Sequence, residues 1–265
     1  MAVRVEILRG KGASETAEAI LTAMAAAIRG AGDAVLETRE FAGNSEWLVL
    51  FGVGAAVHDA ARKRQIKAGG RVLMFDLGYF DRKKVVGHVR MSIDHDHPQQ
   101  WLDRTPSDTT RWDRLGIKLR SDYDPKGPII LVGLGRKSRA YLREPDWEVI
   151  EFKRLRTKYP AREIIYRPKP GHISPNLACP RDEVTPIADL LRGASLAACR
   201  HSNVAVDAVV AGVPFEAVDG AAMWLAGKDY TPANRLDFLR RLAWWQWRAN
   251  EAHLAWDFAK EVARV

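Results

Sequence analysis

The chain has 265 residues and a formal net charge of +8, with 41 Lys and Arg against 33 Asp and Glu. This length suits two compact domains, each with its own core. The sequence has no apolar run of about eighteen residues, and residues 1–9 lack a signal-peptide core, so we expect neither a membrane-spanning nor a secreted protein. Cys179 and Cys199 are too few for a disulfide framework, which favours a reduced, cytoplasmic setting.

The amino-terminal half alternates predicted strands with predicted helices. Short apolar runs predict strands, and longer stretches with apolar residues three or four apart predict helices. The predicted strands are 3–8, 47–53 and 72–75, and the predicted helices are 14–29 and 58–67. Segment 122–128 has two prolines and a glycine among polar residues, which predicts a linker. We therefore expect a first domain at residues 1–124.

The second half repeats the alternation. The predicted strands are 129–132, 164–167 and 196–199, and the predicted helices are 147–158, 187–192 and 204–210. Strands that alternate with helices predict a doubly wound parallel sheet, here at residues 125–234. Residues 235–265 form a long helical pattern, in which we expect four tryptophans to pack between the domains. These are Trp244, Trp245, Trp247 and Trp256.

Three polar loops directly follow strands of the second half. Gly133-Leu134-Gly135 precedes two cations and lets a ligand approach the backbone closely. Two prolines hold Lys169 in an extended loop, and His201-Ser202-Asn203 begins a helix whose free N–H groups suit an anion. Ligands of doubly wound sheets bind beyond the carboxyl ends of the strands, so the loops predict one phosphate site. Taken singly, each loop is also compatible with an ordinary cap or surface turn.

The segment Arg200–Asp207, closed by Ala211-Gly212-Val213-Pro214, resembles the donor-nucleotide site of glycosyltransferases with the GT-B fold. This resemblance implies an α/β protein with two Rossmann-like domains and a last helix, within 235–265, that crosses back to the first domain. It also implies a nucleotide-diphosphate sugar as donor, with UDP as the expected nucleotide, and no tightly bound metal or cofactor. The donor residues that it implies are Gly133, Gly135, Arg136, Lys137, Arg167, Lys169, His201, Ser202, Asn203 and Asp207. Arg200 departs from the small or apolar residue expected before the histidine.

A wider resemblance extends to bacteriophage-type glycosyltransferases, some of which modify hydroxymethylated bases in DNA. The similar stretches are 76–80, 89–98 with Trp101, 167–170, 201–207 and 244–247. The resemblance implies DNA as acceptor, a monomer or weak dimer, and the cytoplasm of a bacterium or a phage-infected host. A surface polysaccharide, a small-molecule acceptor, a non-catalytic nucleic-acid-binding protein and a nucleotide-sugar epimerase stay open as alternatives.

Asp76 is the first candidate for the base that would deprotonate an acceptor hydroxyl, since it ends a strand and precedes a glycine that would loosen the loop. His97 and Asp94 are its rivals, because their loop could reach the same place. His95-Asp96-His97 could also be taken for a metal site, but no third ligand has suitable spacing.

The positive charge is concentrated in two segments. Residues 62–90 contain nine cations and two acids, and residues 136–169 contain eleven cations and five acids. A polyanionic acceptor would use this excess, and the expected contacts to nucleic acid are Arg82, Lys83, Lys84 and Arg90. Solvated basic helix faces would account for the same pattern.

Overall fold

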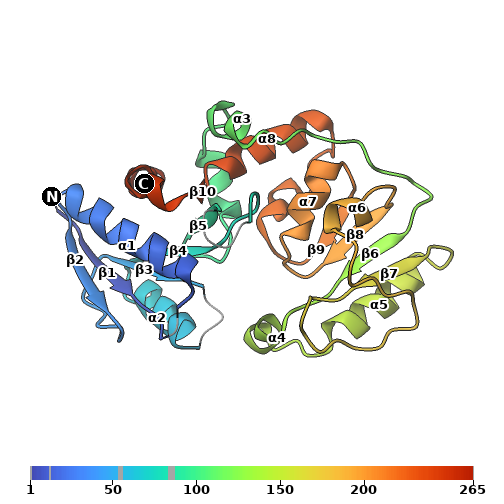
Figure 1. Ribbon diagram of the computed structural model, residues 1–265, viewed down its shortest axis with the longest axis horizontal. Coiled ribbons are helices and arrows are strands. Elements are labelled where there is room, and N and C mark those ends of the chain that lie inside the picture. Colours follow the sequence, from blue (N-terminus) through green and yellow to red (C-terminus); the bar gives the residue numbers. More distant parts are fainter. Residues whose placement is uncertain (1, 12, 53–55, 83–86, 265) are drawn as a thin grey trace. The chain divides into compact units, whose positions relative to one another are not determined.

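The computed structural model describes residues 2–11, 13–52, 56–82 and 87–264. The chain forms two compact units, which are defined here as unit 1 (Met1–Leu115 with Arg240–Val265) and unit 2 (Gly116–Leu239). Figure 1 shows a separate sheet in each unit. Each unit is described by itself.

Unit 1 is built on a six-stranded sheet with the order β10-β5-β4-β3-β1-β2. The strands are β1 (Arg4–Leu8), β2 (Ala34–Thr38), β3 (Trp47–Phe51), β4 (Arg71–Leu77), β5 (Val89–Ile93) and β10 (Gln246–Trp247). Strands β1 to β4 are parallel, whereas β5 runs antiparallel to β4 and β10 antiparallel to β5. The sequence did not predict β2 or β5, since neither is a continuous apolar run.

The helices of unit 1 follow strands of its sheet along the chain. They are α1 (Glu15–Gly30), α2 (Ala56–Lys67), α3 (Thr110–Leu115) and α9 (Ala252–Ala263), with short 3-10 turns at Gln99–Arg104 and Ala249–Glu251. Ser14 caps α1 by accepting the Ala17 N–H, and the apolar face of α1 is buried. Helix α9 packs against α1, and its Trp256 meets Trp47 edge to face, with ring centroids 5.3 Å apart.

The long helix expected at 235–265 is broken. Helix α8 (Pro232–Ala243) ends before the tryptophan cluster, β10 pairs with β5, and α9 follows. The break lies where Gln246 enters the sheet and its side-chain oxygen accepts backbone N–H groups of residues 79 and 80. The rings of Trp244, Trp245 and Trp247 surround Phe258, at centroid distances of 5.2–5.7 Å. All four residues belong to unit 1, so these tryptophans pack within that unit.

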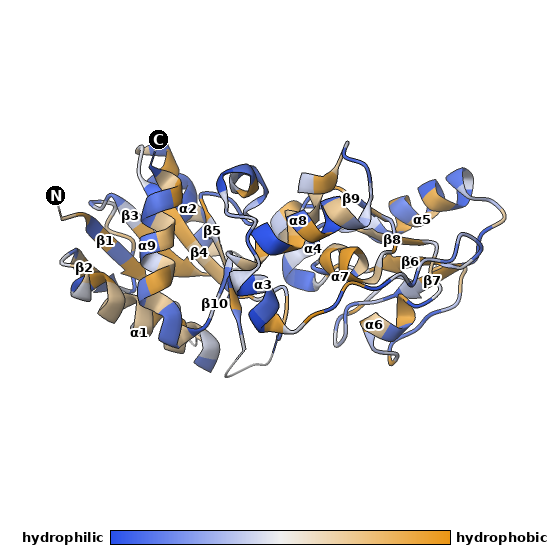
Figure 2. Cartoon of the chain, turned by 90° about the horizontal axis from the view of Figure 1, so that it is seen from above, coloured by the Kyte–Doolittle hydropathy of each residue, from blue (hydrophilic) through white to orange (hydrophobic). Residues whose placement is uncertain are grey.

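Unit 2 has a fully parallel sheet with the order β7-β6-β8-β9. Its strands are β6 (Ile129–Val132), β7 (Ile164–Arg167), β8 (Leu196–Cys199) and β9 (Phe215–Ala217). Its helices are α4 (Arg136–Leu142), α5 (Trp147–Lys158), α6 (Ile187–Leu190), α7 (Val204–Ala211) and most of α8, with a 3-10 turn at Ala221–Leu225. Figure 2 shows α7 as apolar along most of its length, and six of its eight residues are buried.

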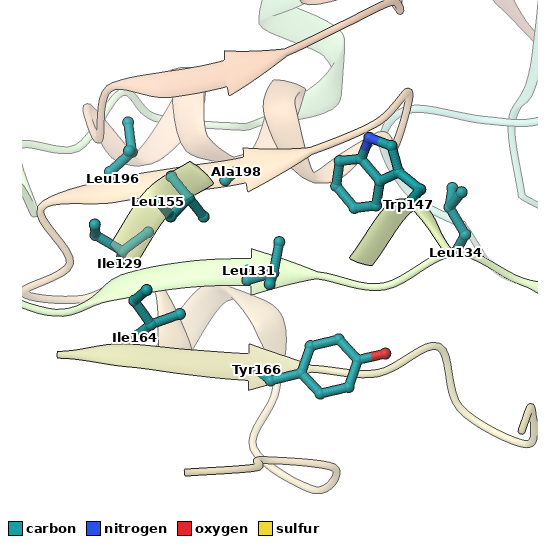
Figure 3. Packing of buried hydrophobic residues seen from close by; sticks show 9 residues of the cluster. All are labelled: Ile129, Leu131, Leu134, Trp147, Leu155, Ile164, Tyr166, Leu196 and Ala198. Carbon is teal, nitrogen blue, oxygen red and sulfur yellow. The ribbon is translucent and has the colours of Figure 1, made fainter. Parts of the chain in front are cut away.

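The core of unit 2 packs the sheet against α5. Side chains of β6, β7 and β8 meet Trp147 and Leu155 of that helix, as Figure 3 shows. The predicted alternation of strands and helices is therefore correct in this unit. The predicted linker at 122–128 instead packs on unit 2, because Arg120 and Asp122 donate their backbone N–H groups to the end of α7, at 2.8 Å each. The chain passes between the units earlier, at Leu115 and Gly116.

Candidate functional site

The three polar loops of unit 2 lie at one edge of its sheet. Strands β6, β7 and β8 are parallel, so the residues that follow them all emerge at the carboxyl edge. Two of the loops are in contact, because a Cβ atom on Gly135 would lie 3.5 Å from Cγ of Lys169. The third loop begins directly after the carboxyl end of β8 and leads into α7.

The glycine loop has no room for a side chain at its first position. The Gly133 N–H donates to the Arg167 carbonyl over 2.8 Å, and a Cβ atom here would lie 2.8 Å from the Tyr166 hydroxyl. The Leu134 N–H donates to the carboxylate of Glu148, on α5, over 2.9 Å. Glu148 is fully buried and also pairs with Arg139 of α4. This hydrogen-bonded pair raises the pKa of Arg139 and fixes the loop between α4 and α5.

The predicted phosphate-binding cations of these loops differ in exposure and in their ion-pair partners. Arg136 and Lys137, in the first turn of α4, and Lys169, after β7, have exposed side chains. Among the described residues, no ion pair engages these three cations. Arg167 instead points to Asp182, with its guanidinium 3.0 Å from the carboxylate. The structure thus leaves three cations available at this edge and uses the fourth internally.

The start of α7 is capped by Ser202, whose hydroxyl accepts the Val204 N–H over 3.2 Å. Asn203 makes no side-chain cap, and its carbonyl accepts the Asp207 N–H over 3.1 Å. The backbone of His201 lies beside Gly220, which follows β9. Asp207 lies half-buried in the first turn of the helix. The turn therefore has the helix start, the polar residues and the acid that the sequence predicts.

Arg200, the residue that departs from the family pattern, is engaged within unit 2. Its guanidinium pairs with both carboxylate oxygens of Glu144, at 2.7 and 3.1 Å. Its charge therefore serves an internal contact between the β8 end and the segment after α4.

In unit 1, Asp76 lies near the carboxyl end of β4 and pairs with Arg90 of β5, Oδ2 to Nη2, over 3.0 Å. Its side chain is 40% exposed, whereas that of Arg90 is 13% exposed. Burial disfavours the Arg90 charge, but the neighbouring acidic groups, with Asp76 first among them, together raise the pKa of Arg90. The carboxylate is thus held in place by a buried cation and stays accessible from solvent.

His97 and Asp94 do not share the position of Asp76. His97 is 2% exposed, and its Nδ1 accepts a hydrogen bond from Arg90 over 3.0 Å and lies 2.9 Å from the Tyr79 hydroxyl. It therefore supports Arg90 from inside the unit. Asp94 lies opposite the start of β4, because β5 is antiparallel, and it pairs there with Arg71 over 2.8 Å. The expectation that the Asp94 loop reaches the same place is wrong for Asp94 itself.

Gly78 does not loosen its loop. A Cβ atom here would lie 2.4 Å from the His88 carbonyl oxygen, so glycine is required by close packing. Of the predicted nucleic-acid contacts, Arg82 donates to the Tyr79 carbonyl over 2.8 Å and Arg90 is buried in the ion pair above. Lys83 and Lys84 lie outside the described residues.

The sequence did not predict a role for His58, a buried residue of α2. Its Nδ1 lies 2.8 Å from the Gly52 carbonyl oxygen and 3.1 Å from that of Phe51, so Nδ1 carries the hydrogen. Nε2 lies against Gly10, and no described residue hydrogen-bonds to it. Gly10 and Gly52 follow β1 and β3, where the strand order of the sheet reverses. A buried lone pair without a described partner thus lies near the switch point of the sheet.

Among the described residues, no group of three His, Cys, Asp or Glu side chains is arranged to hold a metal ion. The segment His95-Asp96-His97 forms bends rather than a strand, so its two histidines do not share a strand face. No helix in the described part of the chain combines the length and apolar character needed to cross a membrane.

Comparison with known proteins identifies two solved structures with a similar fold. This chain is similar to the beta Kdo 2,4 transferase of KpsC from Thermosulfurimonas dismutans. The two share 12% sequence identity with a TM-score of 0.53, and the match covers 92% of this chain and 90% of that one. This chain is also similar to the beta Kdo 2,7 transferase of the same KpsC, with 15% identity and a TM-score of 0.51. That match covers 97% of this chain and 99% of the other. No protein-family model and no curated protein matched the sequence. The predicted α/β class with two Rossmann-like units is confirmed.

The buried Glu148 gives the first testable prediction. Glu148→Gln should destabilise the protein by up to about 3–5 kcal/mol, because Arg139 loses its buried partner. The double variant with Arg139→Gln should be less destabilised than this single one, since the lone cation is gone. Urea unfolding gives the free energies, and hydrogen exchange at the Leu134 amide should accelerate in the single variant.

Glu163→Gln is the matched control, because Glu163 is exposed and its side chain has no described partner. Equal stability of the Glu148 and Glu163 variants would show that the buried pair does not hold the loop.

Proposed function

We propose that this chain is a glycosyltransferase that moves a sugar from a nucleotide-diphosphate sugar to a hydroxyl acceptor. The observation that carries the proposal is the gathering of the glycine loop, Lys169 and the α7 start at one carboxyl edge of unit 2. The fold shared with the two KpsC transferases supports it.

In the proposed donor site, different loops would bind different parts of the nucleotide. Lys169 and the His201–Asn203 turn would bind the pyrophosphate, because a cation and a helix start both favour phosphate oxygens. Asp207 would accept hydrogen bonds from the ribose. Arg136 and Lys137 extend the positive edge, and the close approach at Gly133 keeps the loop backbone in place for the ligand.

The acceptor hydroxyl would lose its proton to Asp76, the accessible carboxylate of unit 1. Arg90 and His97 would act as positioning residues, since both are buried behind that carboxylate. The hydroxyl oxygen then attacks the anomeric carbon, the bond to the nucleotide phosphate breaks, and the nucleotide leaves as the diphosphate.

For the acceptor we propose a molecule that carries phosphate, and the sequence resemblance favours a hydroxymethylated base in duplex DNA. The basic segment that contains Arg82, Lys83 and Lys84 supports this form of the acceptor. A surface polysaccharide is the alternative.

The donor assignment is tested by Asp207→Ala. Loss of one partner of the ribose should weaken nucleotide-sugar binding by about 1–3 kcal/mol in a calorimetric titration. Asp229→Ala, which removes an exposed carboxylate of the same unit, should bind normally. Unchanged affinity of the Asp207 variant with an intact fold would remove this residue from the site.

The base assignment is tested by turnover at saturating donor. Asp76→Asn should lose about 10²–10⁴ in rate while donor affinity is kept. Asp113→Asn removes an exposed carboxylate of unit 1 and should retain turnover. If Asp76→Asn keeps most of its turnover, Asp76 is not the base.

DNA binding should fall steeply with salt, because each phosphate that a cation neutralises releases counterions. Charge reversal at Arg82, Lys83 and Lys84 should flatten the salt dependence and leave donor binding unchanged. Reversal at Arg39, an exposed residue of unit 1, should have less effect. Binding that does not depend on salt, or no binding to any duplex, would move the acceptor to the polysaccharide class.

A further inference from the structure

A tight turn after β7 brings a histidine beside the glycine loop of unit 2. The turn consists of Lys169, Pro170, Gly171 and His172, and the His172 N–H closes it by donating to the Lys169 carbonyl over 3.2 Å. Proline at the second position and a glycine with a φ of +71° at the third are the residues that suit a type II turn. The turn holds Lys169 and His172 close together. His172 has no role in the chemistry proposed above.

Hydrogen bonds to α4 fix the orientation of the His172 ring. Its Nδ1 accepts the Arg136 N–H over 3.3 Å, so in the neutral ring the hydrogen is on Nε2. The next residue is held as well, because Arg139 donates to the Ile173 carbonyl over 2.5 Å and pairs with the buried Glu148. The ring therefore has a set position and tautomer before any ligand binds.

The Nε2 atom of His172 is open to a ligand. The residue is half-exposed, and Nε2 is not one of the buried polar atoms of the chain. In the part of the chain that the structure describes, only Nδ1 of this ring has a hydrogen-bond partner. Lys169 beside it is exposed and makes no ion pair with a described residue. Two hydrogen-bond donors, one of them charged, are thus presented to solvent by one turn.

The space between these two donors is kept open by Gly135. A Cβ atom on this glycine would lie 3.5 Å from Nε2 of His172 and 3.5 Å from Cγ of Lys169, which is ordinary contact distance. Its φ of −77° and ψ of 158° suit any residue. Neither the backbone nor the packing therefore requires glycine here, in contrast to Gly133, where a Cβ atom would clash with the Tyr166 hydroxyl. A side chain at this position would instead fill the space in which a ligand could meet both donors.

We propose that His172 is a further ligand of the donor pyrophosphate. Its Nε2–H donates to a phosphate oxygen that lies over Gly135, beside the ammonium group of Lys169. Phosphate fits because Nδ1 is already used, so the ring can only donate, and a charged oxygen accepts the stronger hydrogen bond. A histidine that only capped the start of α4 would use Nδ1 in the same way but would not account for the open space at Gly135. That the phosphate belongs to a sugar donor rests on the proposed function.

Two substitutions of His172 separate ligand binding from capping. His172→Asn keeps an amide oxygen near the place of Nδ1, so it can still accept the Arg136 N–H, but it has no donor at the place of Nε2. His172→Gln reaches that place with its amide N–H. In a calorimetric titration of the full chain with UDP, the asparagine variant should bind about tenfold more weakly, and the glutamine variant should recover most of this loss. His253→Asn, which removes an exposed histidine of α9 in unit 1, is the control and should bind normally.

Gly135→Ala tests the open space without touching either donor. Because the added methyl group meets no atom closer than 3.5 Å, the variant should unfold at the same urea concentration as the wild type. It should nevertheless bind UDP at least as weakly as His172→Asn. The matched control is Gly30→Ala at the end of α1, where a Cβ atom would meet nothing within 4 Å. The imidazole NMR signals of His172 should shift with UDP and with inorganic pyrophosphate, and not with uridine.

Each of these measurements can overturn the assignment. Equal UDP affinity of the wild type, His172→Asn and Gly135→Ala would remove His172 from the site, and so would a shift of its signals by uridine alone. A loss in His172→Gln as large as that in His172→Asn would reduce His172 to a cap.

The proposed function can fail separately. If UDP binding depends on His172 but no sugar is transferred from any nucleotide sugar, the phosphate contact stands and the transferase proposal fails. If Asp207→Ala impairs donor binding and transfer occurs, but His172→Asn changes neither, the proposed function stands and the role of His172 is rejected.

Discussion

The side-chain oxygen of Gln246 makes the contact on which the loop after β4 in unit 1 depends. It accepts two consecutive backbone N–H groups, those of Tyr79 and Phe80, from a segment far away in the sequence. The loop after β4 can lie this close to β5 and β10 only because Gly78 has no side chain. The placement of Tyr79, and through it of His97 and Arg90, follows from this one amide.

The glycine loop of unit 2 is held in the same way, by a buried side-chain acceptor. A buried side chain from a helix, Glu148, accepts the Leu134 N–H just after a strand, and Arg139 neutralises its charge. In both units a loop past a strand end is thus held by a buried acceptor rather than by its own sequence. Loops held in this way lose little further freedom when a ligand binds, which favours affinity.

The sequence predicted the elements of unit 2 well, because each strand there is a short apolar run and each loop carries its own glycine, proline or polar cap. It could not predict strand direction. The antiparallel β5 sends Asp94 to the opposite edge from Asp76, although the two residues are close in the chain. Nor could it predict Glu148, Gln246 or the Arg200–Glu144 pair, since their partners depend on tertiary packing and local patterns carry no such information.

Many of the cations that make segment 136–169 basic are already in ion pairs. In the basic segment 136–169, Arg154 and Lys158 both pair with Glu216, Arg139 pairs with Glu148, and Arg167 pairs with Asp182. These cations are engaged in ion pairs within unit 2. The cations of this segment without a described ion pair include Arg136, Lys137 and Lys169, which lie at the carboxyl edge of the sheet. The count of cations in this segment therefore overstates the charge that a polyanion could meet.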